Sequence, residues 1–157
     1  MLKVLVEKWD KNKERLKEAL SDVINSGIDY EDLVRLTFST IYNDGDESIE
    51  YPHNELDCDE ITKIDNGDYQ GTLLFLIPFE TYQPSECEYL MTYVGYGSCS
   101  GCDTLLAITD YNNRGEKFSE SQVNDLLTLC KDILTNTIKP YNYGWRENDN
   151  FKPIEAI

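Results

Sequence analysis

The chain has 157 residues, of which 40% are hydrophobic and 28% are charged. This length is typical of one globular domain, and the apolar content is enough for a core that needs neither disulfides nor a metal. Thirty acidic residues oppose 14 basic ones, and the formal net charge of −16 disfavours direct binding to nucleic acid. The apolar stretches are too short to cross a bilayer, so no membrane association is expected.

The first residues and the cysteines predict a reducing, cytoplasmic environment, either in a bacterial cell or in a phage-infected host. The segment from Met1 to Val6 has neither the long apolar core nor the small-residue cleavage site of a secretory signal. An odd number of cysteines is expected to supply thiols or metal ligands and not a disulfide framework. The five are Cys58, Cys87, Cys99, Cys102 and Cys130.

Two helices are expected before residue 46. The first is predicted to begin at Asp10, an N-cap residue type, and to end at Asn25–Gly27. Its apolar face comprises Leu16, Ala19, Leu20, Val23 and Ile24. Asp29 is predicted to cap the second, which Asn43–Asp46 interrupts. Its apolar positions are Tyr30, Leu33, Val34, Thr37, Phe38 and Ile41. The short connection predicts an antiparallel helical hairpin.

Four antiparallel strands are predicted in the middle of the chain. Glu60–Asp65 is followed by Asn66-Gly67, a dipeptide that favours a type I′ hairpin turn. The strand Asp68–Ile77 is apolar on both faces from Leu73 onward, which indicates a central position. The third and fourth strands are predicted at Tyr89–Tyr96 and Thr104–Thr109.

A final helix and an aromatic tail complete the expected α+β domain, in the order αα-ββββ-α. Ser119 and Gln122 form a capping box, with Phe118 and Val123 as its hydrophobic staple, and Pro140 ends the helix. The predicted buried positions are Val123, Leu126, Leu127, Cys130, Ile133, Leu134 and Ile138. As one domain, 1–157 divides into a helical hairpin (1–45), an acidic loop (46–59), the sheet (60–110), the helix (119–139) and the tail (140–157), in which Tyr141, Tyr143 and Trp145 are expected to fold back.

The segment Tyr96-Gly-Ser-Cys-Ser-Gly-Cys-Asp103 contains two thiols three positions apart. As a structural turn, it would use its small residues to pack the bend and Asp103 to accept backbone N–H bonds. As a metal site, Cys99 and Cys102 would supply two of the four ligands of a structural zinc, so zinc is the one cofactor considered. Of the other soft candidates, Cys58, Cys87 and His53, none lies in a second close pair.

A redox dithiol and a phosphate-binding cysteine loop are two further interpretations of the segment. The redox interpretation is disfavoured because the first cysteine of such a pair starts a helix, whereas Thr104–Thr109 has the pattern of a strand. The phosphate interpretation is excluded because no Arg or Lys lies between Cys99 and Asn113 to hold the anion.

This octet, together with Asp68-Tyr-Gln-Gly71, resembles a pattern in a family of uncharacterised bacterial and bacteriophage proteins. The stretch Trp9-Asp-Lys-Asn-Lys13 is similar to phage proteins of low-GC Gram-positive hosts. The likeness covers about the central quarter of the chain and this short N-terminal stretch. Because the family has no assigned chemistry, the resemblance implies an origin and not an activity.

The other polar residues do not form a recognisable catalytic arrangement, so no catalytic residue is assigned. A binding protein is therefore favoured over an enzyme. His53, the only histidine, lies in an acidic loop with no evident orienting partner. The acids of 44–47 and 57–60 lack the regular spacing of an EF-hand calcium loop, and solvated loops are the favoured interpretation.

Residues 41–68 hold ten acids and one base, Lys63, which predicts an acidic face. Such a face can occupy a basic nucleic-acid-binding groove, so the leading hypothesis is an interaction protein that inhibits a basic host partner. Its predicted binding residues are Asp44, Asp46, Glu47, Asp57, Asp59 and Glu60. The alternatives are a Cys99/Cys102-dependent zinc or thiol protein, and a small-molecule binder. The loop candidates for the latter are Tyr96, Ser98, Cys99, Ser100, Cys102 and Asp103.

Overall fold

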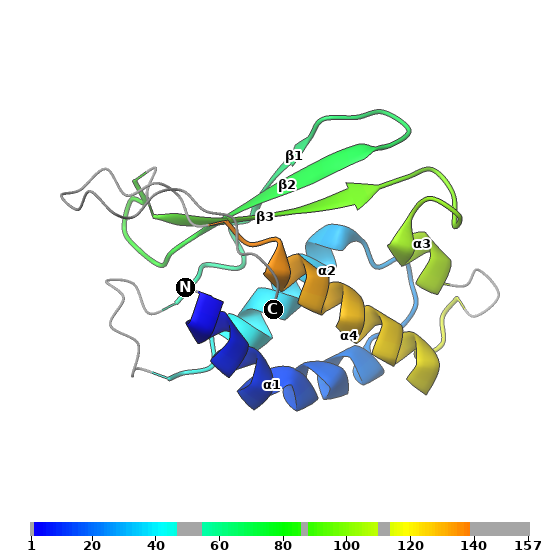
Figure 1. Ribbon diagram of the computed structural model, residues 1–157, viewed down its shortest axis with the longest axis horizontal. Coiled ribbons are helices and arrows are strands. Elements are labelled where there is room, and N and C mark those ends of the chain that lie inside the picture. The colour runs from blue at the N-terminus through cyan, green and yellow to red at the C-terminus, as the bar shows by residue number, and fades with distance from the viewer. Residues whose placement is uncertain (1, 47–54, 86–87, 110–113, 139–157) are drawn as a thin grey trace.

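The computed structural model describes residues 2–46, 55–85, 88–109 and 114–138. The chain combines helices with a three-stranded antiparallel sheet, and the helices pack against one face of that sheet (Figure 1). The α+β class is confirmed. The four-stranded sheet is wrong, and the helical-hairpin layout is not confirmed. The first helix packs against η1, which continues α2, and equally against α4. No described helix is both long and apolar enough to span a membrane.

The first helix, α1 (Leu2–Asp22), begins two turns before the predicted start at Asp10. The reason is that Leu5 and Trp9 continue the buried stripe of Leu16 and Leu20 toward the N-terminus. A helix that can bury two further large side chains gains more from extension than from a cap at an exposed aspartate.

The second helical segment begins where the sequence predicts. Asp29 accepts a hydrogen bond from the Asp32 N–H, and the Asp32 carboxylate accepts one from the Asp29 N–H, which completes a capping box for α2 (Tyr30–Thr37). The chain continues without a break into a π-helical turn, η1 (Phe38–Tyr42), which ends at Asn43. The predicted apolar face is buried throughout these two elements.

The sheet is a meander of β1 (Thr62–Asp65), β2 (Gly71–Pro78) and β3 (Tyr89–Tyr96), with β2 in the centre as predicted. Phe75 and Ile77 of β2 lie opposite Thr92 and Leu90 of β3, and all four side chains are buried. The two-residue turn at Asn66-Gly67 is wrong, because 66–70 all lie in the connection between β1 and β2. Gly67 is needed there for space, since a Cβ at this position would lie 2.1 Å from the Gln70 carbonyl oxygen.

The predicted fourth strand is wrong, because residues 104–108 form the short helix α3 (Thr104–Ile108). Asp103 is its N-cap and accepts a hydrogen bond from the Leu106 N–H. Leu105 is buried and Ile108 packs against the core. Their spacing of three residues suits a helix, but in so short an apolar run this spacing does not distinguish a helix from a strand.

The last helix, α4 (Glu120–Thr135), has the predicted capping box between Ser119 and Gln122. It ends before the predicted boundary at 139, because the backbone of Ile138 exchanges two hydrogen bonds with Met91 at the free edge of β3. Leu129 is buried as well, whereas Leu127 and Ile138 are only partly buried. The tail residues Tyr141, Tyr143 and Trp145 lie outside the described residues.

Candidate functional site: a divided acidic segment and a dithiol loop

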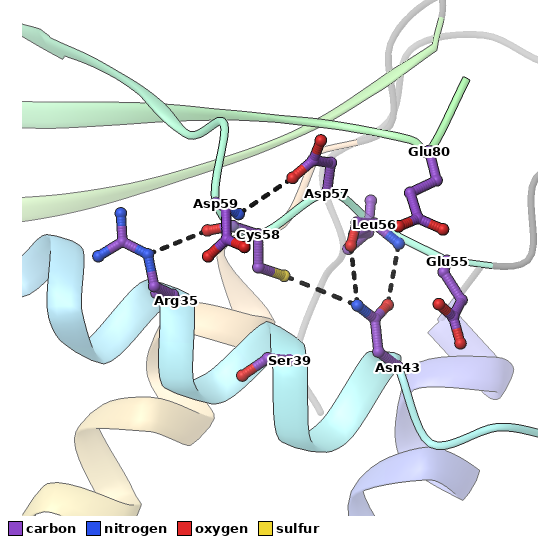
Figure 2. Close-up of a pocket in the computed structure, with 9 residues that line it drawn as sticks. All are labelled: Arg35, Ser39, Asn43, Glu55, Leu56, Asp57, Cys58, Asp59 and Glu80. Carbon is purple, nitrogen blue, oxygen red and sulfur yellow. Dashed lines mark hydrogen bonds between the residues drawn. The ribbon is translucent and has the colours of Figure 1, made fainter. Parts of the chain in front are cut away.

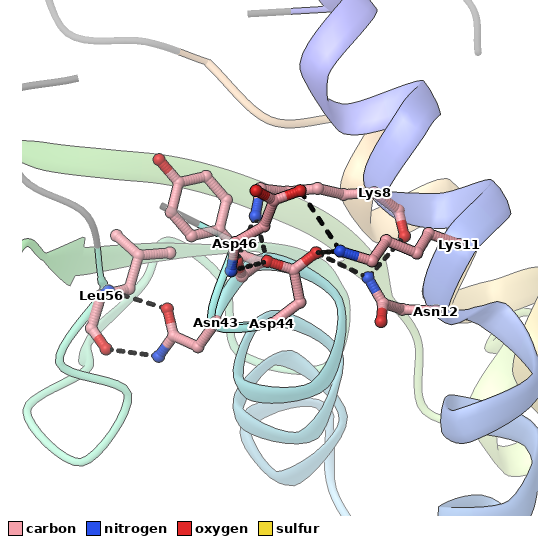
Figure 3. A network of polar contacts seen from close by, with 8 residues as sticks. Lys8, Lys11, Asn12, Asn43, Asp44, Asp46 and Leu56 are labelled. Atoms are coloured by element: carbon pink, nitrogen blue, oxygen red, sulfur yellow. Dashed lines mark hydrogen bonds and ion pairs between the residues drawn. The ribbon is translucent and has the colours of Figure 1, made fainter. Parts of the chain in front are cut away.

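Asp44 and Asp46, two residues of the predicted acidic face, are paired with lysines of α1 (Figure 3). Lys8 Nζ lies 2.5 Å from Asp44 Oδ1 and donates to the Tyr42 carbonyl oxygen at 2.9 Å. Asn12 Nδ2 donates to the second Asp44 oxygen at 2.9 Å, and Lys11 binds Asp46 at 3.2 Å. These two carboxylates therefore serve the packing of η1 against α1 and add no uncompensated charge to a binding surface.

Burial of the Asp44 carboxylate opposes its ionisation. Hydrogen bonds from Lys8, the Asp46 backbone N–H and Asn12 outweigh that effect and hold the pKa of Asp44 below its ordinary value of 3.8. The side chains of Lys8 and Asp44 are 6% and 1% exposed, so this is a buried ion pair.

The acids that follow line a cavity of about 320 Å³ between η1, α2 and the end of β2 (Figure 2). Four carboxylates surround it, with Arg35 as its one cationic residue. The lining consists of Arg35, Ser39, Asn43, Glu55, Leu56, Asp57, Cys58, Asp59 and Glu80. Glu60 is exposed beside this segment, and Glu47 lies outside the described residues.

The backbone of this acidic segment is held in place from two sides. The Asn43 amide both donates to and accepts from the backbone of Leu56, at 2.8 and 2.9 Å, while Arg35 Nε donates to the Cys58 carbonyl at 3.0 Å. Toward the sheet, the Asp57 N–H donates to the Pro78 carbonyl and the Glu80 N–H to that of Glu55. The backbone that carries these acidic residues is thus held in place, and the Asp57 carboxylate also accepts a hydrogen bond from the Asp59 N–H at 3.1 Å.

The acids of the cavity also act on the neighbouring thiol of Cys58, although burial is the larger influence. Burial raises the pKa of Cys58 to about 12, and Asp57 and Asp59 add to that effect, with Arg35 opposing it and Glu55 reinforcing it. Arg35 is itself engaged, since its guanidinium lies 3.1 Å from Glu31 and 3.9 Å from Asp32. The sequence did not reveal Glu80, which lies 21 residues beyond Asp59 and is brought to the cavity by the pairing of Leu56 with Phe79 and by its own backbone bond to Glu55.

The cysteine loop is held by one buried side chain. Asp103 is 7% exposed and accepts hydrogen bonds from the Tyr30 hydroxyl at 2.9 Å, the Gly97 N–H at 3.0 Å and the Leu106 N–H at 3.0 Å. These bonds join α2, the end of β3 and α3. The Asp103 carboxylate thus has three intramolecular donors, as the structural-turn interpretation expects.

The two thiols lie together on the surface of the loop. Cys99 Sγ and Cys102 Sγ are 2.8 Å apart, both side chains are exposed, and the Cys102 N–H donates to the Cys99 carbonyl oxygen at 3.0 Å. The Cys99 N–H points at Cys102 Sγ, at 3.1 Å. The short helix α3 replaces the expected strand, but it begins after Cys102 with Asp103 as its N-cap, so the first cysteine of the pair does not lie at a helix N-terminus.

The other candidate residues of the loop are Tyr96, Ser98 and Ser100. The Tyr96 hydroxyl donates to the Asp65 carboxylate at 2.7 Å, and this hydrogen bond raises the pKa of Tyr96 to about 12. Ser98 and Ser100 are exposed. In the described part of the chain, no group of three or more His, Cys, Asp or Glu side chains is arranged to hold a metal ion, and His53 and Cys87 lie outside that part.

Gly97→Ala is expected to destabilise the protein by about 1–3 kcal/mol, since a Cβ at Gly97 would lie 2.6 Å from both the carbonyl oxygen and the sulfur of Cys102. Urea unfolding measures the change. Gly101→Ala is the matched control, because its Cβ would meet nothing closer than Cys99 Sγ at 3.9 Å. Equal effects of the two substitutions would contradict the close approach at Gly97.

Comparison of the chain with protein-family models, with curated proteins and with solved structures finds no match.

Proposed function

We propose that this protein is a binding module that accepts a cationic side chain of a basic partner in the cavity lined by Glu55, Asp57, Asp59 and Glu80. The observation that carries the proposal is that these four acidic residues line one cavity of about 320 Å³, whose single arginine is already bound by Glu31. That volume suits one guanidinium or ammonium group with part of its aliphatic stem.

The charge of these residues is available to a ligand. Within the described ranges, none of the four carboxylates forms an ion pair, in contrast to Asp44 and Asp46. The net charge of −16 adds a long-range attraction that raises the association rate of basic partners and weakens as salt is added.

The proposed partner is a basic host protein that binds nucleic acid. The carboxylates would occupy its nucleic-acid-binding groove in place of backbone phosphates. The contact depends on the cavity acids and exposed Glu60, since Asp44 and Asp46 are committed to lysines. The proposed compartment is the cytoplasm of a bacterial or phage-infected cell. The proposed mechanism is inhibition of the partner by occupation of its groove.

The triple substitution Asp57→Asn, Asp59→Asn and Glu80→Gln is expected to weaken binding of a fluorescein-labelled nona-arginine peptide at least about tenfold, or about 1.4 kcal/mol. Fluorescence anisotropy at low and at physiological salt measures the affinity and its salt dependence. The matched control changes the net charge by the same amount away from the cavity. It carries Glu14→Gln, Asp125→Asn and Asp132→Asn at exposed positions of α1 and α4.

The control is expected to change affinity less than about threefold, because dispersed surface charges act mainly through a screened long-range field. Equal losses in the two variants would show that net charge alone attracts the peptide and would overturn the cavity proposal. Salt-insensitive binding by the native chain would also contradict it.

A further inference from the structure

We propose that Cys99 and Cys102 form a surface dithiol that undergoes thiol–disulfide exchange with low-molecular-weight disulfides and closes reversibly into an intramolecular disulfide. This inference is independent of the acidic cavity. It assigns a redox-active modification site to the loop between β3 and α3.

The loop conformation already brings the two sulfurs together. Their separation of 2.8 Å is accompanied by the turn hydrogen bond from the Cys102 N–H to the Cys99 carbonyl oxygen. Gly97 admits Cys102 at a distance that any side chain would block. Closure therefore needs little rearrangement of the backbone, which makes the intramolecular step fast relative to attack by a second external thiol.

The frame that carries the dithiol is anchored outside it. Asp103 ties Gly97 to Tyr30 of α2, and both Gly97 and Asp103 are buried, whereas the two cysteines are exposed. A disulfide reagent can therefore reach the sulfurs while the anchoring bonds stay in place.

The other described cysteines differ from this pair in their exposure and in the pKa of their thiols. Cys58 and Cys130 are buried, and burial raises the pKa of each to about 12, which leaves them as unreactive thiols at neutral pH. They are internal controls within the same molecule.

The surroundings favour Cys102 as the attacking thiolate. A hydrogen bond with the Cys99 thiol, followed by donors from the backbone of Cys99 and from Ser98, outweighs desolvation and lowers the pKa of Cys102 below its ordinary value of 9.0. The carboxylate of Asp103, the residue after Cys102, accepts hydrogen bonds from Tyr30, Gly97 and Leu106. Cys99 is then the resolving thiol.

The exchange balances with a disulfide such as oxidised glutathione as the oxidant. The Cys102 thiolate attacks one glutathione sulfur, a protein–glutathione disulfide forms, and the glutathione S–S bond breaks with release of one thiolate. Cys99 loses its proton and attacks the Cys102 sulfur, which forms the Cys99–Cys102 bond and expels the second glutathione. Two protein thiols are oxidised by two electrons, and one glutathione disulfide is reduced to two thiols.

The test uses the full chain carrying Cys87→Ser, incubated with oxidised glutathione and analysed by intact mass and peptide mapping. The expected product has lost two hydrogens, contains a Cys99–Cys102 link and returns to the dithiol with reduced glutathione. The variants Cys99→Ser and Cys102→Ser cannot close the ring. The first is expected to accumulate the mixed disulfide, and the second to react about tenfold more slowly than the first.

A pH profile of iodoacetamide alkylation tests the assignment of the attacking sulfur. Cys102 is expected to react at least about tenfold faster than Cys58 and Cys130 at neutral pH, and Cys99→Ala is expected to move the Cys102 profile to higher pH. Accumulation of mixed disulfide in the chain that retains both thiols would overturn the proposal. So would equal reactivity of all cysteines, or stoichiometric zinc that survives dialysis and protects both thiols from alkylation.

Discussion

Asp44→Ala is expected to lower the free energy of unfolding by about 3–5 kcal/mol, because it leaves the ammonium of Lys8 buried without its counter-ion. Lys8 is held 2.5 Å from Asp44 at side-chain exposures of 6% and 1%, so solvent cannot replace the lost carboxylate. Asn12 loses its acceptor on Asp44 in the same change. Urea unfolding followed by circular dichroism gives the difference.

Two variants check that interpretation. Asp46→Ala removes an ion pair whose lysine is 55% exposed, and it is expected to cost less than about 1 kcal/mol. Lys8→Met combined with Asp44→Leu is expected to recover much of the loss, because an apolar pair of similar volume often replaces a buried ion pair without penalty. A loss below about 1 kcal/mol for Asp44→Ala would contradict a buried pair.

The same pair predicts a stability that depends on pH at the acidic end. Because the pKa of Asp44 is lower in the folded chain than its ordinary value of 3.8, this group stabilises the fold above pH 3.8. That contribution is lost as the pH falls through the folded-state pKa. Asp44→Asn is expected to flatten this part of the stability profile, and unchanged slopes would argue against the assignment.

Asp103→Ala is expected to destabilise the protein by about 3 kcal/mol, because three donors lose their acceptor in a buried place. The Tyr30 hydroxyl and the N–H groups of Gly97 and Leu106 all bind this carboxylate. The substitution also removes the N-cap of α3, which is worth about 1 kcal/mol within that total. Thermal or urea unfolding measures the loss.

Tyr30→Phe serves as the partial control, since it removes one of the three bonds and is expected to cost about 1 kcal/mol. Burial, opposed by the Leu105 N–H and reinforced by Asp103, raises the pKa of Tyr30 to about 12. The folded chain thus holds this proton more tightly, and the contribution of Tyr30 is present below pH 10 and lost as the pH rises toward 12. A native-like alkaline profile in Tyr30→Phe would contradict this account.

Local signals in the sequence were sufficient where one residue pair decides a boundary. The Asp29 cap and the capping box of Ser119 with Gln122 were predicted correctly, because such caps depend on residues within one turn. Strand β3 was predicted with its observed bounds. Leu90, Thr92 and Val94 are buried at every second position, and only Tyr96 at the C-terminal end departs from this alternation.

Short ambiguous runs were decided by tertiary contacts. Residues 104–108 have apolar side chains that suit either a strand or a helix, and the outcome depends on Asp103, which Tyr30 of α2 holds from 73 positions away. Likewise, α4 ends early because Ile138 meets the edge of β3, which no local pattern near Pro140 indicates.

By itself, the sequence determined the α+β class, the central position of β2, the surplus of negative charge and the spacing of two cysteines three positions apart. These follow from composition, periodicity and spacing along the chain. Only the tertiary structure decided which acids carry uncompensated charge: Asp44 and Asp46 meet the lysines of α1, whereas Asp57 and Asp59 join Glu80 at a cavity. The physical reason is that an ion pair depends on distances of a few ångströms between residues far apart in sequence, which charge counts along the chain do not contain.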